Sequence, residues 1–332
     1  MPQTGGRDRL RYCHLAMIMM EIRTLDHFVL IYEKYAASEN KSQRTIEGVR
    51  NAVRIFGDFL GQNTDPANIK SEDLVNYKLY LKTRTKWSQV PSKKKQYGYL
   101  TPASIASYVR SIRSFFSWME GEEFISANPF TRIKPPNVPM KIVDPLVPQD
   151  VSQLLKFMSR KSYRGFRDSC VILTLYGTAM RISEAFDLKT TDVDFNSGEI
   201  KVMGKGAKQR NLYMSPTLFK ALYKYQSQWR PKVASEYFFV HESGGKLDRF
   251  YFEHRLKLYV KQSGITKRCT PHSFRYGCAI QLIRNGVDPF TVQAILGHAT
   301  LEMTRHYVRL ANSDVEKKMK SSSPAEQITI KF

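Results

Sequence analysis

The chain has 332 residues, of which 42% are hydrophobic, and this apolar content excludes a largely disordered protein. Its 52 Lys and Arg residues exceed its 30 Asp and Glu residues, and the net charge of +22 predicts a polyanionic partner. Nucleic acid is the natural candidate, although a ribosome or an anionic membrane surface would also satisfy the charge. No apolar run approaches the roughly 20 residues of a membrane span. The four cysteines have neither C-x-x-C nor zinc-site spacing, so a reduced, cytoplasmic protein is expected.

Residues 1–20 are expected to be a disordered N-terminal extension. Arg7, Arg9 and Arg11 precede a short apolar run over 15–20. A signal peptide is disfavoured, because the run is short and no small-residue cleavage site follows it. We therefore expect Met20 to be the true start of translation.

Residues 21–130 predict a helical bundle. Apolar residues recur at helical spacing in four successive stretches, which indicates four amphipathic helices packed together. The aromatic side chains of Phe56, Phe115 and Trp118 are expected to form part of its core.

A basic loop separates the third and fourth of these helices. Residues 82–97 contain six Lys or Arg and no acidic residue. Such a run is either a solvated loop or a set of phosphate contacts, and the second interpretation is preferred if the chain acts on a nucleic acid. The candidate DNA contacts in it are Lys86, Lys93, Lys94 and Lys95.

A linker is predicted at 131–147. Six prolines lie between positions 129 and 148, and proline neither continues a helix nor donates a backbone hydrogen bond. The chain is therefore expected to form two domains joined by an extended segment.

The second domain, 148–310, is predicted to be mainly helical with a small antiparallel sheet. Residues 195–198 are typical of a turn between extended segments. Glu199–Met203 and 210–214 alternate as strands and are expected to pair across a turn at 204–208. Residues 237–240 are a candidate third strand. The expected fold class is thus mainly α with one small antiparallel sheet, as a helical bundle followed by a mixed α/β domain, and if the partner is nucleic acid the bundle is the expected DNA-binding domain.

The segment 270–307 is predicted to form three short helices. The first is capped by Thr270, has Pro271 at its first position and stops near Gly286. The second ends at Gly297, and a third begins at about 300. Side chains at the ends and on the faces of these helices are expected to meet in one pocket. They are His272, Arg275, His298 and Tyr307.

These side-chain types suit one reaction. Tyrosine is a weak nucleophile at neutral pH because its pKa is about 10. It becomes effective where cationic donors stabilise both the phenolate and the transition state of a phosphodiester. Arginine supplies planar, charged donors, and histidine transfers protons near pH 7. The set is typical of phosphoryl transfer to tyrosine without a metal, although an isolated His-x-x-Arg is more often a surface pair.

The order and spacing of these residues resemble the tyrosine recombinases, the phage-integrase family. His272 and Arg275 are three residues apart, His298 lies 23 residues after Arg275, and Tyr307 lies nine residues after His298. Upstream, 177–184 resembles the first arginine box of the family and 204–206 resembles its lysine hairpin. The resemblance is firm over 148–310, and over 21–130 it rests on length and helical pattern and implies a SAM-like core-binding domain.

The resemblance implies roles for the cations. Arg181 and Arg275 would clamp the scissile phosphate, and Lys205 would protonate the leaving 5′ oxygen, with Lys208 as its rival. From local sequence alone, Arg181 fits an ion pair with Glu184 or Asp187, and Lys205 fits a solvated turn. Two further candidate DNA contacts follow the hairpin tip, namely Lys208 and Arg210.

It also implies roles for the remaining residues. Tyr307 would attack the phosphate, His272 would accept or position its proton, and His298 would donate to a phosphate oxygen. Glu184 would orient His272 or Arg181 without reacting. From local sequence alone, Tyr307 also fits a packing role and His298 a helix cap.

The sequence departs from the family at one place. The family usually has a second histidine directly after the second arginine, whereas here Tyr276 follows and then Gly277 and Cys278. We expect unusual packing beneath this helix, and Tyr276 is a remote alternative nucleophile.

The resemblance implies a site-specific DNA recombinase or integrase that closes as a clamp on double-stranded DNA. Cleavage would give a 3′-phosphotyrosine and a free 5′-hydroxyl, and rejoining would need no cofactor, metal or ATP. The implied assembly is a homotetramer on synapsed DNA, with a monomer as the DNA-free alternative, no membrane association and accessory DNA-bending or directionality factors as candidate partners. The tail 311–332 is a candidate for docking onto a neighbouring protomer.

Three rival interpretations remain open from the sequence. A type IB-like topoisomerase would share the nucleophile and the cations but rejoin the same strand. A catalytically idle DNA-binding accessory protein would need none of the polar positions. A basic RNA-binding protein is disfavoured because no known RNA-binding module is evident.

Overall fold

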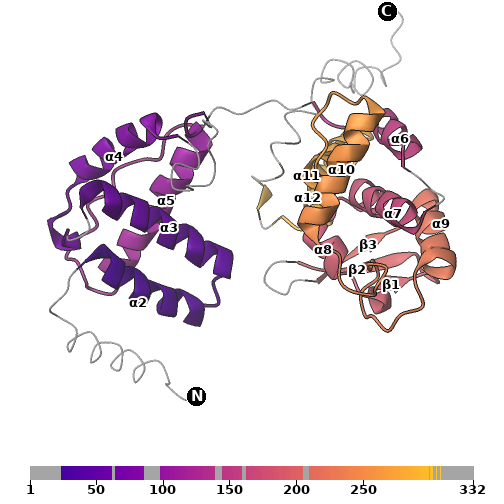
Figure 1. Cartoon of the computed structure of the whole chain (residues 1–332), viewed down its shortest axis with the longest axis horizontal. Helices are drawn as coiled ribbons and strands as arrows, with labels where there is room; N and C mark the ends of the chain where they lie inside the picture. The colour runs from indigo at the N-terminus through magenta and orange to yellow at the C-terminus, as the bar shows by residue number, and fades with distance from the viewer. Residues whose placement is uncertain are drawn as a thin grey trace, which may run out of the picture. The chain divides into compact units, whose positions relative to one another are not determined.

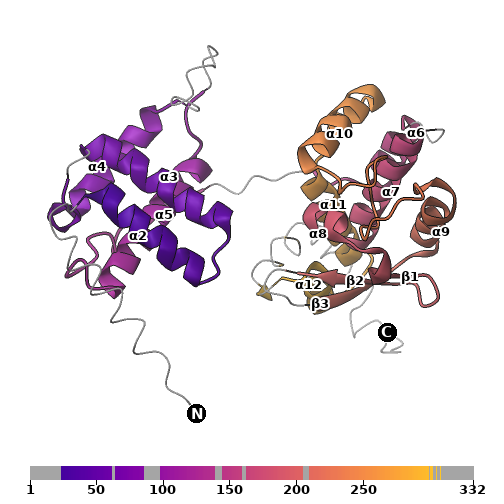
Figure 2. The same ribbon diagram turned by 60° about the horizontal axis from the view of Figure 1, so that its bottom comes forward.

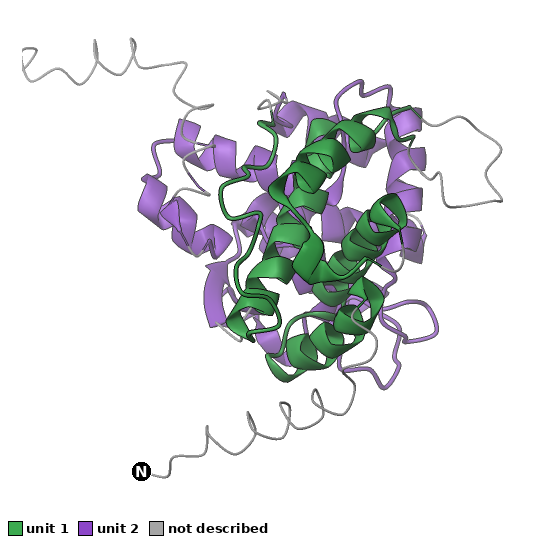
Figure 3. Cartoon of the chain, turned by 90° about the vertical axis from the view of Figure 1, so that its left-hand side faces the viewer, with its two compact units in different colours: residues 1–141 green, residues 142–332 purple. Residues whose placement is uncertain are grey.

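The chain divides into two compact units, residues 1–141 and 142–332 (Figure 3), and the division lies inside the predicted linker. The computed structural model describes residues 24–61, 64–85, 98–138, 144–158, 162–204, 209–298, 300–301, 304 and 307. None of the helices in these ranges is long and apolar enough to cross a membrane. The predicted extension 1–20 and tail 311–332 lie outside the described residues, as do Lys86, Lys93, Lys94, Lys95, Lys205 and Lys208.

The first unit is a bundle that contains the four predicted helices (Figure 1). Thr24, Ser42 and Thr101 each accept a hydrogen bond from a backbone N–H in the first turn of the helix that follows, which satisfies a group with no partner inside that helix. The elements are α2 (Leu25–Ser38), α3 (Gln43–Leu60), a 3₁₀ turn (Pro66–Asn68), α4 (Ser71–Thr83) and α5 (Pro102–Gly121).

Aromatic side chains from α3 and α5 fill the centre of this bundle. Phe56, Phe115 and Phe116 are fully buried, and Trp118 is 8% exposed. The rings of Phe56 and Phe116 pack edge to face with centroids 6.4 Å apart. Burial of each such ring contributes about 2–3 kcal/mol to folding. The predicted core role of Phe56, Phe115 and Trp118 is confirmed.

The second unit combines seven named α-helices with a small sheet among the residues described (Figure 1). The fold class predicted from the sequence is therefore confirmed. In chain order its described elements are α6 (Pro148–Lys156), α7 (Tyr163–Thr178), α8 (Ile182–Asp187), a 3₁₀ turn (Thr190–Asp192), β1 (Val193–Asp194), β2 (Glu199–Met203), β3 (Gln209–Tyr213), α9 (Pro216–Lys224), a π-helical turn (Tyr225–Trp229), α10 (Arg249–Ser263), α11 (Pro271–Arg284) and α12 (Pro289–Leu296).

The sheet is antiparallel, with the order β1-β2-β3. Ile200 pairs with Leu212, and Val202 pairs with Arg210, so β2 and β3 form the predicted hairpin. α12 packs beside β3, as Figure 2 shows. One prediction was wrong: residues 237–240 form only isolated bridges, not a strand. Three consecutive side chains there are buried, so the alternation that a half-buried strand requires is missing.

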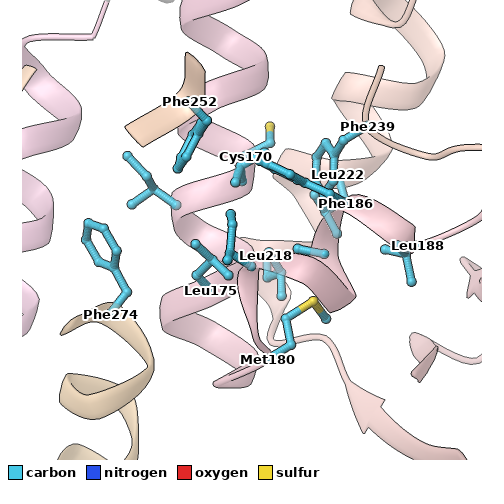
Figure 4. Packing of buried hydrophobic residues seen from close by; sticks show 14 of the residues in the cluster. Cys170, Leu175, Met180, Phe186, Leu188, Leu218, Leu222, Phe239, Phe252 and Phe274 are labelled. Carbon is cyan, nitrogen blue, oxygen red and sulfur yellow. The ribbon is translucent and has the colours of Figure 1, made fainter. Parts of the chain in front are cut away.

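Helix α7 forms the centre of the second unit. Its apolar residues Cys170 and Leu175 are buried against side chains from α8, α9, α10 and α11 (Figure 4). Because α7 is covered on several sides, the chain that leaves it at Thr178 starts from a fixed point. That point is where the first arginine box begins.

Gly277 lies at a close contact beneath α11. A Cβ atom at this position would lie 2.5 Å from the carbonyl oxygen of Leu146 and 3.2 Å from the ring of Tyr176. Only glycine therefore allows α11 to pack this closely against α7 and the chain before α6.

Candidate active site

Arg181 and Glu184 are positioned by the start of α8. Ala179 has a left-handed backbone, with φ of 54°, which turns the chain sharply after α7. Arg181 then occupies the N-cap of α8. The carboxylate of Glu184 accepts hydrogen bonds from the backbone N–H of Arg181 and from its Nη1, both at 2.7 Å. The expectation that Glu184 contacts Arg181 thus matches this geometry.

Arg210 does not lie where a surface phosphate contact would lie. Its Nη1 and Nη2 donate to the two carboxylate oxygens of Glu184 at 3.1 and 2.7 Å, and its Nε donates to the carbonyl of Ile295 at 2.9 Å. Its side chain is only 12% exposed. In this structure Arg210 forms an internal ion pair with Glu184, and its role as a DNA contact stays a prediction.

Opposing effects act on Glu184. Burial raises the pKa of this carboxyl, but the hydrogen bonds and charges of Arg210 and Arg181 outweigh burial and hold the pKa below its usual value. Glu184 is therefore ionised at neutral pH. It provides one negative charge between two arginines.

Arg275 lies in α11 and is 2% exposed. Its Nη1 donates to the carbonyl of Ala179 and its Nη2 to the carbonyl of Leu296, both at 2.7 Å. Burial and the neighbouring charge of Arg181 lower the pKa of Arg275 to about 10, so the side chain remains charged at pH 7. These two hydrogen bonds to backbone carbonyls fix the orientation of the guanidinium.

His298 follows the end of α12. Gly297 has φ of 61° and turns the chain there, and Nδ1 of His298 lies 3.1 Å from the hydroxyl oxygen of the buried Thr304. Burial, followed by the charges of Arg275 and Arg181, lowers the pKa of His298 to about 4. The imidazole is therefore neutral at pH 7. If Thr304 donates to Nδ1, then Nε2 carries the hydrogen.

His272 lies in the first turn of α11, where Thr270 caps the helix as predicted. Burial lowers the pKa of His272, and the charges of Arg275 and Arg181 lower it further. A neutral imidazole accepts a proton. The structure thus gives both histidines of the predicted set a neutral form at pH 7.

Tyr307 packs between aromatic rings and is 5% exposed. Its ring centroid lies 5.9 Å from that of His298 and 5.5 Å from that of Tyr276. Burial raises the pKa of Tyr307 above its usual value, and the charge and hydrogen bonding of Arg275 offset only part of that rise. Tyr276 belongs to the buried apolar cluster of α11 and α12.

Five of the predicted residues line one hollow of about 550 Å³. They are Arg181, His272, Arg275, His298 and Tyr307, and the hollow is completed by Ile182, Ser183, Arg249 and Pro271. Sequence reasoning missed Arg249, the first residue of α10, whose Nε donates to Glu253 at 2.7 Å. The signal in the sequence that could have indicated it is Asp248, a side chain typical of a helix N-cap, directly before Arg249. Within the described part of the chain, no three His, Cys, Asp or Glu side chains gather as a metal site would require.

Comparisons with known proteins identify the family of the chain. The sequence model of the Phage integrase family matches residues 145–314. Tyrosine recombinase XerD of Listeria monocytogenes is 29% identical over 302 residues, which cover 88% of this chain and 95% of that protein. A tyrosine recombinase of Thermosipho africanus is 31% identical over 293 residues, which cover 87% of this chain and 97% of that protein.

A solved structure shares the fold. The integrase of transposon Tn1549, in complex with circular intermediate DNA, matches with a TM-score of 0.70 and 20% identity, over 92% of this chain and 99% of that one. The extent of the family match and the identity to full-length relatives lead to one conclusion. The chain belongs to the phage integrase family and is a tyrosine site-specific recombinase, an enzyme that breaks and rejoins DNA.

Proposed function

We propose that Tyr307 is the nucleophile and forms a covalent 3′-phosphotyrosyl bond with the cleaved DNA strand. The observation that carries this proposal is the hollow in which Tyr307 meets Arg181, Arg275 and two histidines. Burial keeps the pKa of the Tyr307 hydroxyl above its usual value, and the charge and hydrogen bonding of the adjacent Arg275 limit that rise, which further supports the proposal. A phenol beside a buried, fixed cation is the arrangement that phosphoryl transfer to tyrosine requires.

Each side chain takes one part in the reaction. The phenol oxygen of Tyr307 forms a bond to phosphorus, and the bond from phosphorus to the 5′ oxygen breaks. The phenol proton passes to neutral His272, and Lys205 supplies a proton to the 5′ oxygen. Arg181 and Arg275 stabilise the charge on the non-bridging phosphate oxygens as it develops.

His298 acts as a neutral donor. With a pKa of about 4 it does not carry a positive charge at pH 7, but its Nε2–H can donate to a phosphate oxygen when Thr304 holds Nδ1. The arginines then supply the positive charge that stabilises the phosphate, and His298 supplies a hydrogen bond that orients it.

Rejoining reverses these steps with the 5′-hydroxyl of a partner strand. The energy of the broken phosphodiester is kept in the phosphotyrosine, so neither ATP nor a metal is needed. We propose that four copies act on two synapsed DNA duplexes, that the free protein is a monomer, and that it works in the cytoplasm. Among the described residues, Cys269 and Cys278 are free thiols, which suits a reducing compartment.

The test is a covalent capture assay in EDTA. A nicked duplex carrying the end of the native element, or a randomised library where that end is unknown, is incubated with the protein and quenched with detergent. A protein–DNA adduct that maps to Tyr307 supports the proposal. Tyr307→Phe should abolish the adduct, whereas the matched change Tyr276→Phe should retain it.

Two results would contradict the proposal. Tight binding with no adduct would indicate an accessory role, and an adduct at Tyr276 would reassign the nucleophile. Strand exchange between two differently labelled duplexes then separates recombination from rejoining of the same strand, which is the reaction of a type IB topoisomerase.

A further inference from the structure

The carboxylate of Glu184 is saturated with hydrogen bonds. One oxygen accepts from Nη1 of Arg181 at 2.7 Å and from Nη1 of Arg210 at 3.1 Å. The other accepts from the backbone N–H of Arg181 and from Nη2 of Arg210, both at 2.7 Å. A carboxylate offers about four acceptor sites. All four are used, two by each arginine.

The two arginines differ in what else they face. Arg181 has a side chain that is 37% exposed, and it lines the hollow with Tyr307. Arg210 has a side chain that is 12% exposed, and its Nε donates to the carbonyl of Ile295. Arg181 is therefore the arginine available to a phosphate, and Arg210 is held inside the protein.

We propose that Arg210 is a positioning residue for Arg181. Arginine and carboxylate prefer a bidentate pair in which two guanidinium N–H groups face both oxygens. Because Arg210 already makes that pair with Glu184, the side chain of Arg181 is limited to one bond through Nη1. The rest of its guanidinium stays directed to the scissile phosphate.

Charge leads to the same conclusion. Glu184 is ionised. Without Arg210 its negative charge would be balanced by Arg181 alone, and the pair would present no net positive charge to the DNA phosphate. With Arg210 present, the three side chains carry a net positive charge. Arg210 therefore preserves the attraction between Arg181 and the phosphate.

The same residue also supports His298. The bond from Nε of Arg210 to Ile295 holds the last turn of α12, and a Cβ at Gly297 would lie 3.1 Å from Nη1 of Arg210. One side chain on β3 thus links Arg181, through Glu184, to the turn that carries His298. This inference rests on the proposed function, since it assigns Arg210 to the site around Tyr307.

The first test compares DNA binding with cleavage in Arg210→Met and Arg210→Lys. We expect Arg210→Met to bind DNA within about threefold of wild type and to form the Tyr307 adduct about 100-fold more slowly, which is the usual loss when one charge-stabilising group fails. Arg210→Lys keeps the charge without the bidentate geometry and should be intermediate. The matched control is Arg164→Met, which removes an exposed ion pair with Glu242 at the opposite end of α7.

The second test separates positioning from a general structural role. In Arg210→Met/Glu184→Gln the carboxylate no longer draws Arg181 away, so adduct formation should be about tenfold faster than in Arg210→Met alone. A residue that merely stabilises the fold would give a double variant no faster than the single one. That result, or wild-type cleavage by Arg210→Met, would overturn the inference.

The crystal structure of DNA-free Arg210→Met decides the matter without any activity. Arg181 is expected to close onto both oxygens of Glu184, and an Arg181 that keeps its single side-chain bond would refute the proposal. If instead the wild-type protein forms no adduct at Tyr307, the proposed function has failed, and the variant structure still shows whether Arg210 positions Arg181.

Discussion

The imidazole of His298 stacks on the ring of Tyr307, with centroids 5.9 Å apart and an angle of 25° between the planes. This contact buries both rings beside Arg275, and the same surroundings shift the pKa of His298 down and that of Tyr307 up. The proposed nucleophile and the proposed donor are therefore coupled before DNA binds. Their protonation is open to direct measurement.

The first prediction concerns pH. His298 should titrate near pH 4 in the folded protein, against about 6.5 in the unfolded chain. Its contribution to stability is then fully present above pH 6.5 and decreases as the pH falls toward 4, because only the unfolded chain binds the proton in that range. Histidine NMR resonances followed from pH 8 to 4 measure this directly. A midpoint for His298 near 6.5 would contradict the environment described.

The second prediction concerns the turn at Gly297. Gly297→Ala places a side chain at a φ of 61° and 3.1 Å from the Arg210 guanidinium, so it should destabilise by about 2–3 kcal/mol. Gly198→Ala is the matched control, because its φ of 73° imposes a similar backbone strain and a Cβ there meets open space. It should cost about 1 kcal/mol. Urea unfolding curves compare them, and equal losses would show that the contact with Arg210 contributes nothing.

The third prediction concerns the contact between α7 and α11. Gly277→Ala forces a methyl group to within 2.5 Å of the Leu146 carbonyl, which is backbone and cannot rotate away. A loss of about 2–3 kcal/mol and slower adduct formation are expected, because α11 carries Arg275. Gly177→Ala in α7 makes only an ordinary 3.5 Å contact with Leu218 and should be neutral or stabilising by up to about 1 kcal/mol. Thermal melts measure the stability of both variants. A Gly277→Ala variant as stable as Gly177→Ala would show that the predicted clash with the Leu146 carbonyl is wrong.

The fourth prediction concerns a buried carboxylate in α7. Asp168 is fully buried and accepts hydrogen bonds from Nε and Nη2 of Arg167, from Nε of Arg255 and from the hydroxyl of Tyr259. Asp168→Asn removes the charge that balances a buried arginine and should destabilise by about 3–5 kcal/mol.

The control for this change is Glu242→Gln, which breaks the exposed pair with Arg164 and should cost less than about 1 kcal/mol. Denaturation with urea measures both variants. A small effect of Asp168→Asn would mean that the buried arginine finds another partner.

The sequence predicts the local features well, because they depend on neighbours in the chain. Thr270 caps the start of α11 and Gly297 ends α12, and both lie where the sequence pattern predicts them. The spacing of His272 and Arg275 fixes a shared helix face. These are short-range relations, and the fold class follows from their sum.

Contacts between residues far apart in the chain could not be predicted from local sequence patterns. Arg210 is separated from Glu184 by 26 residues, and nothing near it in the sequence distinguishes an internal ion pair from a surface contact. The run 237–240 has strand-like composition, yet its consecutive buried side chains form a covered segment. Arg249 entered the hollow only through the packing of α10.

The end of α12 is fastened by two arginines from other elements. Arg210 holds the carbonyl of Ile295, and Arg275 holds that of Leu296, so two successive carbonyls at a helix C-terminus are occupied by cations. The C-terminal end of α12 is thereby fixed to β3 and α11. With both carbonyls held, a change in the position of Tyr307 relative to Arg275 would have to arise in the chain after Leu296 and not within α12.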